Sequence, residues 1–361
     1  MRINLLTLFV IFHCNNGNQN DNKVKEFLKR INSENYQNGI RPGFSKGEID
    51  KVEMNMYINS FGSISESLME YTISIFMRQS WRDERLRHNL TKLTLSYHYG
   101  DILWVPDLFF RNEKKAYVHR VIHPNKLITV SEDGRVTYSQ RITLKLSCNM
   151  ILLKFPVDTQ VCPLYLESFG YTTEELMFYW KKKNPVQLNI ENELPKYELK
   201  DMIFDNCTQN YLTGNFTCIK TVFTLERQYD FYIIQFYLPS ILIVMISWIS
   251  FWIDNEAIPA RISLGLLTVL TQITQMSGLK NLSPAVSYVT TLDVWNFACL
   301  IFTCAAFIEF SIVNGVKYGV KDDKTTIEEK EQSRETDGVS TTMNHQIRRR
   351  HIKMKKFSCK M

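Results

Sequence analysis

The side chains of this chain best placed to do chemistry are hydroxyls and amides set in an apolar segment, PARISLGLLTVLTQITQMSGLK, from Pro259 to Lys280. Each such group is costly in hydrocarbon unless it finds a hydrogen-bond partner, so a helix that met only lipid would not carry several of them. A helix that lines water can carry them easily. We therefore expect a water-lining helix whose polar side chains are Ser263, Thr268, Thr271, Gln272, Thr274, Gln275 and Ser277.

Four cysteines form a second group, in two neighbouring pairs. Cys148 and Cys162 enclose NMILLKFPVDTQV, and Cys207 and Cys218 enclose TQNYLTGNFT. Four cysteines allow three connectivities, so pairing between neighbours is an inference. Disulfides closing loops of this size would stabilise the fold by roughly 3 kcal/mol each in the chain-entropy account. The spacings are too wide for a zinc knuckle and no histidine cluster accompanies them, so we expect no metal site.

No catalytic motif stands out in the sequence. Gly43-Phe-Ser-Lys-Gly fits the serine-hydrolase elbow, but no hydrophobic strand precedes it and no helix follows. Walker, HExxH and dinucleotide motifs are missing, so we expect neither an enzyme nor a cofactor. The net charge is +6, but no basic run alternates with aromatic residues, and nucleic acid is not indicated. His119 and His123 would share one face of a strand, as zinc-modulating or as ordinary surface histidines.

The elements that must position these residues change in character near residue 230. From about Val52 to Tyr229 the sequence shows short alternating runs broken by turn signals, which are typical of an antiparallel β-sandwich, and we assign residues 15–230 to this ligand-binding domain. The residues that follow contain apolar runs long enough to span ~30 Å of hydrocarbon. We therefore predict an α+β membrane protein, an extracellular β-sandwich followed by transmembrane α-helices. The predicted membrane region is 231–314, with spans at 231–253, 259–279 and 288–313.

The two ends of the chain give its expected orientation. Residues 1–14 are interpreted as a signal peptide, and 315–361 as a basic cytoplasmic tail that fits the positive-inside tendency. Sequons favour secretion of the first region and are glycosylation candidates at Asn89, Asn206 and Asn215.

Longer motifs resemble a known family. The Cys148–Cys162 loop, with Phe-Pro-Val-Asp near its middle, resembles the signature of the Cys-loop (pentameric ligand-gated) receptors. Six further segments are similar to glycine receptor α subunits in order and spacing, and the resemblance runs from about residue 50 to 315. The Cys207–Cys218 pair is similar to that of glycine receptors and glutamate-gated chloride channels. The similar segments are INSFGSISESLMEY, WVPDLFFRNEK, ESFGYTTEEL, LERQYDFY, PSILIVMISWISFWI and PARISLG.

The resemblance implies a subunit of a pentameric chloride channel in the plasma membrane, with homologous subunits as partners and a postsynaptic location as a further expectation. The implied agonist is glycine, with glutamate as the alternative. Arg78 and Ser139 on the complementary face would take the agonist carboxylate, and aromatic faces would attract its ammonium by about 0.5–2 kcal/mol. The principal face of the neighbouring subunit would supply Glu167, Ser168, Phe169, Tyr211, Thr213 and Phe216.

Two positions bear on the choice between the agonists. Glutamate-gated relatives carry an additional arginine where this chain has Asn59, and they favour tyrosine where Phe169 stands. Both differences favour glycine. Arg111 stands where glycine receptors have a small residue, and it could reshape the pocket.

Periodicity alone leaves two candidate faces for the side of the second span that meets water. One carries Thr268, Thr271, Gln272 and Gln275. The resemblance selects the other face, where a leucine ring would close the pore by dewetting. That face consists of Ser263, Leu267, Leu270, Thr274 and Ser277.

The ends of the second span are expected to set charge selectivity. Pro259, Ala260 and Arg261 present no acid at the cytoplasmic start, where the helix dipole adds positive potential, and Lys280 is basic at the outer mouth. This arrangement favours anions. A role for Arg261 as a mere helix anchor is the alternative.

Related subunits continue into a fourth transmembrane helix, whereas this sequence stops at Met361. Two explanations are open: the sequence is incomplete, or it is a truncated, non-conducting subunit that regulates assembly, which is a further functional hypothesis.

Overall fold

The computed structural model describes residues 21–319 except 34–35, 190–193, 255, 283–285 and 318, and it gives no side chains for 280–282. The predicted signal peptide and the tail from residue 320 lie outside the described residues. The chain separates into two compact units, described here one at a time. The first contains the residues up to Asp230 together with Pro284–Thr291, and the second contains Phe231–Ser283 together with the residues from Leu292 onward.

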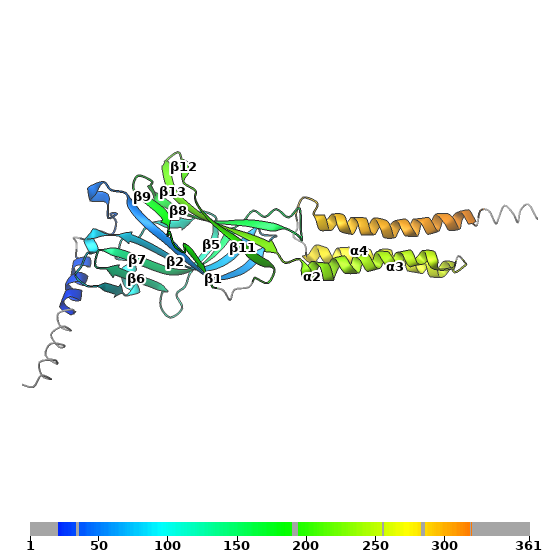
Figure 1. The fold of residues 1–361 in the computed structure, drawn as a ribbon, viewed down its shortest axis with the longest axis horizontal. Coiled ribbons are helices and arrows are strands. Elements are labelled where there is room, and N and C mark those ends of the chain that lie inside the picture. The colour runs from blue at the N-terminus through cyan, green and yellow to red at the C-terminus, as the bar shows by residue number, and fades with distance from the viewer. Residues whose placement is uncertain are drawn as a thin grey trace, which may run out of the picture. The chain divides into compact units, whose positions relative to one another are not determined.

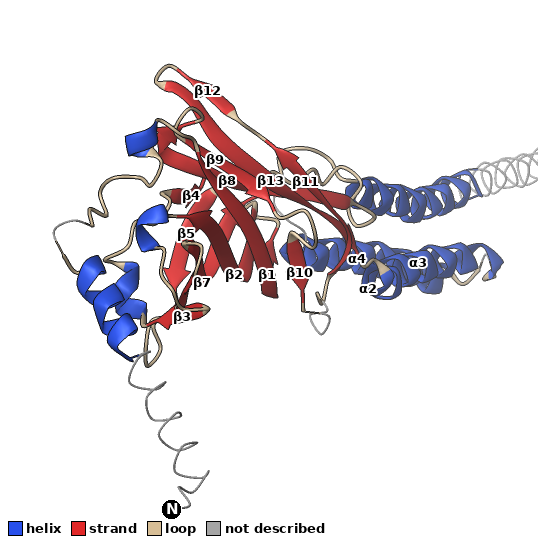
Figure 2. Ribbon diagram, turned by 60° about the vertical axis from the view of Figure 1, so that its left-hand side comes forward, coloured by secondary structure: helices blue, strands red, loops and turns tan. Residues whose placement is uncertain are grey.

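The first unit is a sandwich of two sheets, as predicted, and Figure 2 shows its strands in red. Among the described residues, the larger sheet has eight strands, six of them in the order β10-β1-β2-β7-β6-β3, with β5 also paired to β7 and β9 to β1. Their bounds are β1 Asp50–Ser65, β2 Glu70–Arg82, β3 Lys92–Leu95, β5 Glu113–Val118, β6 Lys126–Ser131, β7 Arg135–Ser147, β9 Leu176–Trp180 and β10 Val186–Leu188.

The smaller sheet has five strands within the described part of the chain, four of them in the order β11-β13-β8-β4, with β12 paired to β13. The β12–β13 hairpin forms one tip of this sheet (Figure 1). The bounds are β4 Leu108–Phe110, β8 Thr159–Thr172, β11 Tyr197–Asn206, β12 Gln209–Tyr211 and β13 Gly214–Arg227.

The core lies between the inward faces of the two sheets. Strand β1 alternates as predicted for a half-buried strand, with Val52, Met54, Met56 and Ile58 fully buried. Burying each such side chain stabilises the fold by about 1.5–3 kcal/mol. The pairing is antiparallel as predicted except at β9 and β10, which lie parallel to β1. A parallel pair needs a long connection, which the sequence supplies because much of the chain lies between β1 and these strands.

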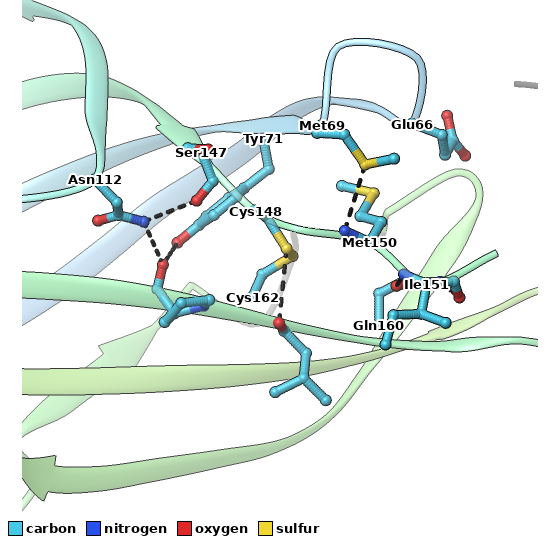
Figure 3. Close-up of a disulfide and its surroundings, with 12 residues drawn as sticks. Glu66, Met69, Tyr71, Asn112, Ser147, Cys148, Met150, Ile151, Gln160 and Cys162 are labelled. Carbon is cyan, nitrogen blue, oxygen red and sulfur yellow. Dashed lines mark hydrogen bonds between the residues drawn. A yellow bond between two sulfur atoms is a disulfide. The ribbon is translucent and has the colours of Figure 1, made fainter. Parts of the chain in front are cut away.

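Both disulfides join neighbouring cysteines, so the connectivity that the sequence left open is resolved. Cys148 follows β7 and is bonded to Cys162 in β8, while Cys207 follows β11 and is bonded to Cys218 in β13. Around the first disulfide, Asn112 donates from its side-chain amide to the carbonyls of Ser147 and Pro163 (Figure 3). The loop between β7 and β8 is therefore fastened at its two ends.

A buried arginine holds together the end of the sandwich that carries this loop. Arg227, the last residue of β13, has a fully buried side chain. Its guanidinium contacts Asp158 at 2.6 Å and Glu66 at 2.5 Å, and it lies over the rings of Phe155 and Tyr197. The Tyr197 hydroxyl also donates to Glu66, at 2.9 Å. The Arg227 guanidinium thus contacts side chains from segments that are distant in the sequence.

Apart from the end residues Asp230 and Thr291, the second unit contains three helices long and apolar enough to cross a membrane, counted over the described residues: Asp230–Trp252, Ile258–Leu279 and Thr291–Lys317. The first is made of α2 Asp230–Tyr232, a π-helical turn Ile233–Tyr237, α3 Leu238–Ile249 and a 3₁₀ turn Ser250–Trp252, and the second span lies in α4 Ile258–Leu282. The π-helical turn lies where Pro239 lacks the N–H that would bond one helical turn back.

The third helix begins later than the predicted residue 288. The Tyr288 hydroxyl accepts a hydrogen bond from the Leu152 N–H, and Thr291 donates through both its N–H and its hydroxyl to the Leu153 carbonyl. These bonds keep residues 288–290 out of the helix. Apolar content alone could not place this boundary, because the bonding partners lie in the loop between β7 and β8.

The Glu66 contact predicts a specific loss of stability in acid. Burial raises the pKa of the Glu66 carboxyl, but the hydrogen bond and charge of Arg227 outweigh it, so the pKa lies below its ordinary value of 4.5. A lowered pKa gives stability that is present above pH 4.5 and is lost as the pH falls through the folded-state pKa.

We therefore expect Glu66→Gln to lower the free energy of unfolding by about 1.5–3 kcal/mol at pH 7. The difference in this free energy between the variant and the original chain should become smaller below about pH 4.5. Intrinsic-fluorescence melting of the purified full chain between pH 3 and 7 measures this. Glu198→Gln is the matched control, because the Glu198 side chain is 58% exposed. A difference in stability between the variant and the original chain that stays constant down to pH 3 would contradict the expectation.

Candidate ligand site and pore helix

The residues predicted for the principal face lie on β8, on β13 and in the β12–β13 hairpin, all in the five-stranded sheet. The Phe169 side chain is 79% exposed, and its ring packs edge-on against Phe109 at 5.6 Å. Tyr211 is exposed at the hairpin, 5.8 Å from the buried ring of Phe216. Thr213 is exposed in the turn of the same hairpin. The sheet therefore presents aromatic side chains and a hydroxyl around the hairpin.

Ser168 has a structural partner that the sequence analysis missed. Ser168 is buried, and its hydroxyl donates to Asp107 at 2.7 Å while accepting from the Tyr171 N–H. Asp107 also accepts from the Gly170 N–H, at 2.5 Å. Asp107 thus fixes the backbone around Phe169. The sequence offered a weak signal, an acidic residue directly before strand β4, to which we gave no role.

Glu167 also has a partner within its own chain. Its carboxylate is 1% exposed and lies 3.3 Å from Nη1 of Arg111. The register places Glu167 opposite Phe109 on β4 and opposite Cys218 on β13. Glu167, which was predicted for the principal face, is therefore already paired with a cation of its own chain.

The two residues predicted for the complementary face lie directly opposite each other. Arg78 on β2 and Ser139 on β7 are Cα partners in the eight-stranded sheet. The Arg78 side chain is half-buried and donates from Nη1 to the Asn55 side chain at 3.1 Å, while Ser139 is buried. Asn59, where relatives were expected to carry arginine, lies at a register irregularity of β1. A guanidinium and a hydroxyl in this register can bind one carboxylate.

The two groups of residues do not form one site within a single chain. They belong to different sheets, and in the described part of the chain no hydrogen bond or ring contact joins a member of one group to a member of the other. We call the two groups the aromatic half-site and the cationic half-site of the predicted ligand site.

The water-facing side of α4 can now be compared with the two candidate stripes. Thr268 and Gln272 are buried among the helices of their own unit, and Gln275 donates to the Phe236 carbonyl at 3.0 Å. Leu267 and Leu270 are exposed, as are Ser263, Thr274 and Ser277. The hydroxyls of Ser263 and Thr274 bond to carbonyls of the preceding turn. The neighbouring helices thus leave the stripe selected by the resemblance uncovered, whereas they cover the other stripe except at Thr271, which is exposed.

Arg261 is directed toward the helix bundle. Its side chain is buried, its Nη2 donates to the Ile253 carbonyl, and its guanidinium lies 5.6 Å from the Phe310 ring. This placement suits the anchoring role, with the charge acting at a distance rather than at the exposed face. Pro259 and Ala260 precede it in the first turn of α4, and the Lys280 side chain lies outside the described residues.

The remaining predicted sites are on the surface of the first unit. The glycosylation candidates Asn89, Asn206 and Asn215 are all exposed. His119 bonds to the Thr143 hydroxyl and His123 stacks on Tyr97, so the two histidines have different partners. Within the described residues there is no group of three or more histidine, cysteine or acidic side chains that could hold a metal ion.

Comparison with protein families identifies both units. The model of the neurotransmitter-gated ion-channel ligand binding domain matches residues 24–229. The model of the neurotransmitter-gated ion-channel transmembrane region matches residues 236–356.

The packing of α4 gives a test with an internal control. A Cβ added at Gly265 would lie 2.4 Å from Cδ2 of Phe307 on the third helix, whereas one added at Gly278 would meet nothing within 4 Å. We expect Gly265→Ala to destabilise the helical unit by about 1–3 kcal/mol through overpacking. Gly278→Ala should be neutral or stabilising, because alanine favours helix. Thermal unfolding of the detergent-purified chain compares the two, and equal melting temperatures would contradict this packing.

Proposed function

This chain belongs to the neurotransmitter-gated ion-channel family, and we propose that it is a subunit of a pentameric chloride channel opened by extracellular glycine. Members of this family are channels rather than enzymes, with an extracellular ligand-binding domain and a transmembrane region. The observation that carries the proposal is the pair of half-sites, because each lacks the groups that the other supplies.

The chemistry of the half-sites supports a zwitterionic amino acid. Arg78 with Ser139 supplies a guanidinium and a hydroxyl for a carboxylate. The exposed rings of Phe169 and Tyr211 supply faces for an ammonium. Packing the aromatic half-site of one subunit against the cationic half-site of the next would bring the two together, which makes homologous subunits the necessary partners.

Asn59 and Phe169 favour glycine over glutamate. A second carboxylate would need a second cation on the complementary strand, and the residue at that position is Asn59 rather than arginine. A buried carboxylate without a partner is strongly unfavourable, so the smaller agonist fits better.

Features of α4 support anion conduction. Its first turn contains no acidic residue, its amino terminus carries partial positive charge, and Arg261 adds a full charge nearby. Around a fivefold axis these charges would attract anions, while Leu267 and Leu270 would form apolar rings able to close the path by dewetting. We place the channel in the plasma membrane and propose a postsynaptic location.

The direct test is two-electrode recording from cells that express this chain, with glycine and then glutamate applied while the chloride gradient is varied. We expect a glycine-evoked current whose reversal potential follows the chloride equilibrium potential. A current that reverses independently of chloride would contradict anion selectivity. A response to glutamate but not to glycine would show that the agonist is glutamate and that the proposal of glycine is wrong.

Arg78 provides a quantitative prediction. Arg78→Ala removes the proposed carboxylate contact, and charge-assisted hydrogen bonds of this kind are worth about 1.5–3 kcal/mol. The half-maximal glycine concentration should therefore rise by roughly 10- to 100-fold with unchanged surface expression. Arg135→Ala, an exposed arginine on β7, is the control. An unchanged concentration–response curve for Arg78→Ala would exclude this residue from the site.

A further inference from the structure

The aromatic half-site contains an ion pair, Glu167 with Arg111, whose two side chains differ in burial. Glu167 is buried and lies opposite the disulfide-bonded Cys218 in the register of β8 and β13, whereas the Arg111 side chain is 26% exposed. A carboxylate buried to this degree needs a cationic or hydrogen-bonding partner. Among its described contacts, the cation within reach is Arg111, at 3.3 Å.

Arg111 is held in this position by more than the ion pair. It directly follows β4, and its N–H donates to the Tyr165 carbonyl at 3.2 Å. Its guanidinium lies 4.0 Å from the centre of the Tyr165 ring, and Nη1 lies 3.9 Å from Sγ of Cys218. Tyr165, Glu167 and Phe169 share one face of β8, because alternate residues of a strand point the same way. Arg111 therefore lies on the face that also presents Phe169.

We propose that Arg111 is a sensitivity-determining residue, which occupies the Glu167 carboxylate in competition with the ammonium group of the agonist. This inference rests on the proposed function, because it takes the agonist to be an amino acid whose ammonium reaches the aromatic half-site. One carboxylate then has two candidate cations, the resident guanidinium and the incoming ammonium. The agonist must share Glu167 or displace Arg111 from it.

The competition predicts the direction in which glycine sensitivity changes when Arg111 is replaced. A carboxylate whose charge is already balanced by a guanidinium attracts an ammonium less than a carboxylate without such a partner does, and this difference is large in a partly buried site. With Arg111 in place, the ammonium relies mainly on the aromatic faces. Without the charge of Arg111, Glu167 becomes a full counter-charge for the agonist. Removing Arg111 should therefore increase sensitivity to glycine, although it deletes a side chain from the site.

Charge and packing can be separated with two substitutions at this position. Arg111→Gln removes the charge and keeps much of the side-chain length, whereas Arg111→Lys keeps the charge and loses the planar fork. We expect Arg111→Gln to lower the half-maximal glycine concentration by about 10-fold or more, the effect of one charge-assisted hydrogen bond. Arg111→Lys should remain within about 3-fold of the original chain. Arg135→Gln serves as the control for loss of a surface arginine.

The decisive measurement is a double-mutant cycle between Arg111 and Glu167. Glycine concentration–response curves are recorded for Arg111→Gln, Glu167→Gln and the double variant, together with surface labelling and glycine binding to the purified chain. We expect the gain from Arg111→Gln to disappear in the Glu167→Gln background, because the contested carboxylate is then missing. A role in packing alone would give the same change in both backgrounds.

The possible failures are distinguishable. If the original chain responds to glycine but Arg111→Gln leaves the half-maximal concentration unchanged or raises it, the inference about Arg111 is wrong and the proposed function stands. The inference is also wrong if Arg111→Gln still lowers the half-maximal glycine concentration in the Glu167→Gln background. If the original chain reaches the surface yet neither binds nor responds to glycine or glutamate, the proposed function fails and the inference fails with it.

Discussion

The burial of the Arg227 guanidinium is the constraint on which the sandwich most depends. An isolated charge inside a protein is strongly unfavourable, so this side chain can be buried only if Asp158 and Glu66 are brought to it. Asp158 comes from the disulfide-closed loop and Glu66 from the turn after β1. The aromatic rings of Phe155 and Tyr197 enclose the cation. One buried charge thereby requires separate parts of the chain to take up a single arrangement at the end of β13, just before the first transmembrane helix.

The proposed half-sites combine a buried, paired charge with exposed aromatic rings. Charges deep in the sandwich are paired within the chain, and Glu167 with Arg111 is such a pair. The aromatic side chains Phe169 and Tyr211 are instead left exposed, although burying them would be favourable. Exposed aromatic groups beside a disulfide-closed hairpin are therefore suited to binding something outside their own subunit. The same division is found in α4, the proposed pore helix, where Thr268 and Gln272 are buried and Leu267 and Leu270 are exposed.

Much of the fold could be predicted because it is encoded locally. Alternation in β1, β2 and β13, the apolar runs of the helices and the spacing of the cysteines are each visible within a short window. The parallel pairing of β9 and β10 and the start of the third helix at Thr291 were not predictable in this way, because each depends on a partner distant in the sequence. The same reason explains the site. Arg78 and Ser139 were predicted individually, but the Ser168–Asp107 bond, the Arg111–Glu167 pair and the inward direction of Arg261 depend on contacts that no spacing reveals.

The central claim is that a working site is completed between two copies of this chain, and complementation tests it most directly. Phe169→Ala damages only the aromatic half-site, because this side chain is exposed, and Arg78→Ala damages only the cationic one. Each variant expressed alone should give little current at the glycine concentration that is half-maximal for the original chain. Their co-expression should restore glycine responses of near-original sensitivity, because some subunit boundaries then join two intact half-sites. If both variants reach the surface and co-expression restores nothing, the two half-sites do not meet between subunits and the account is wrong.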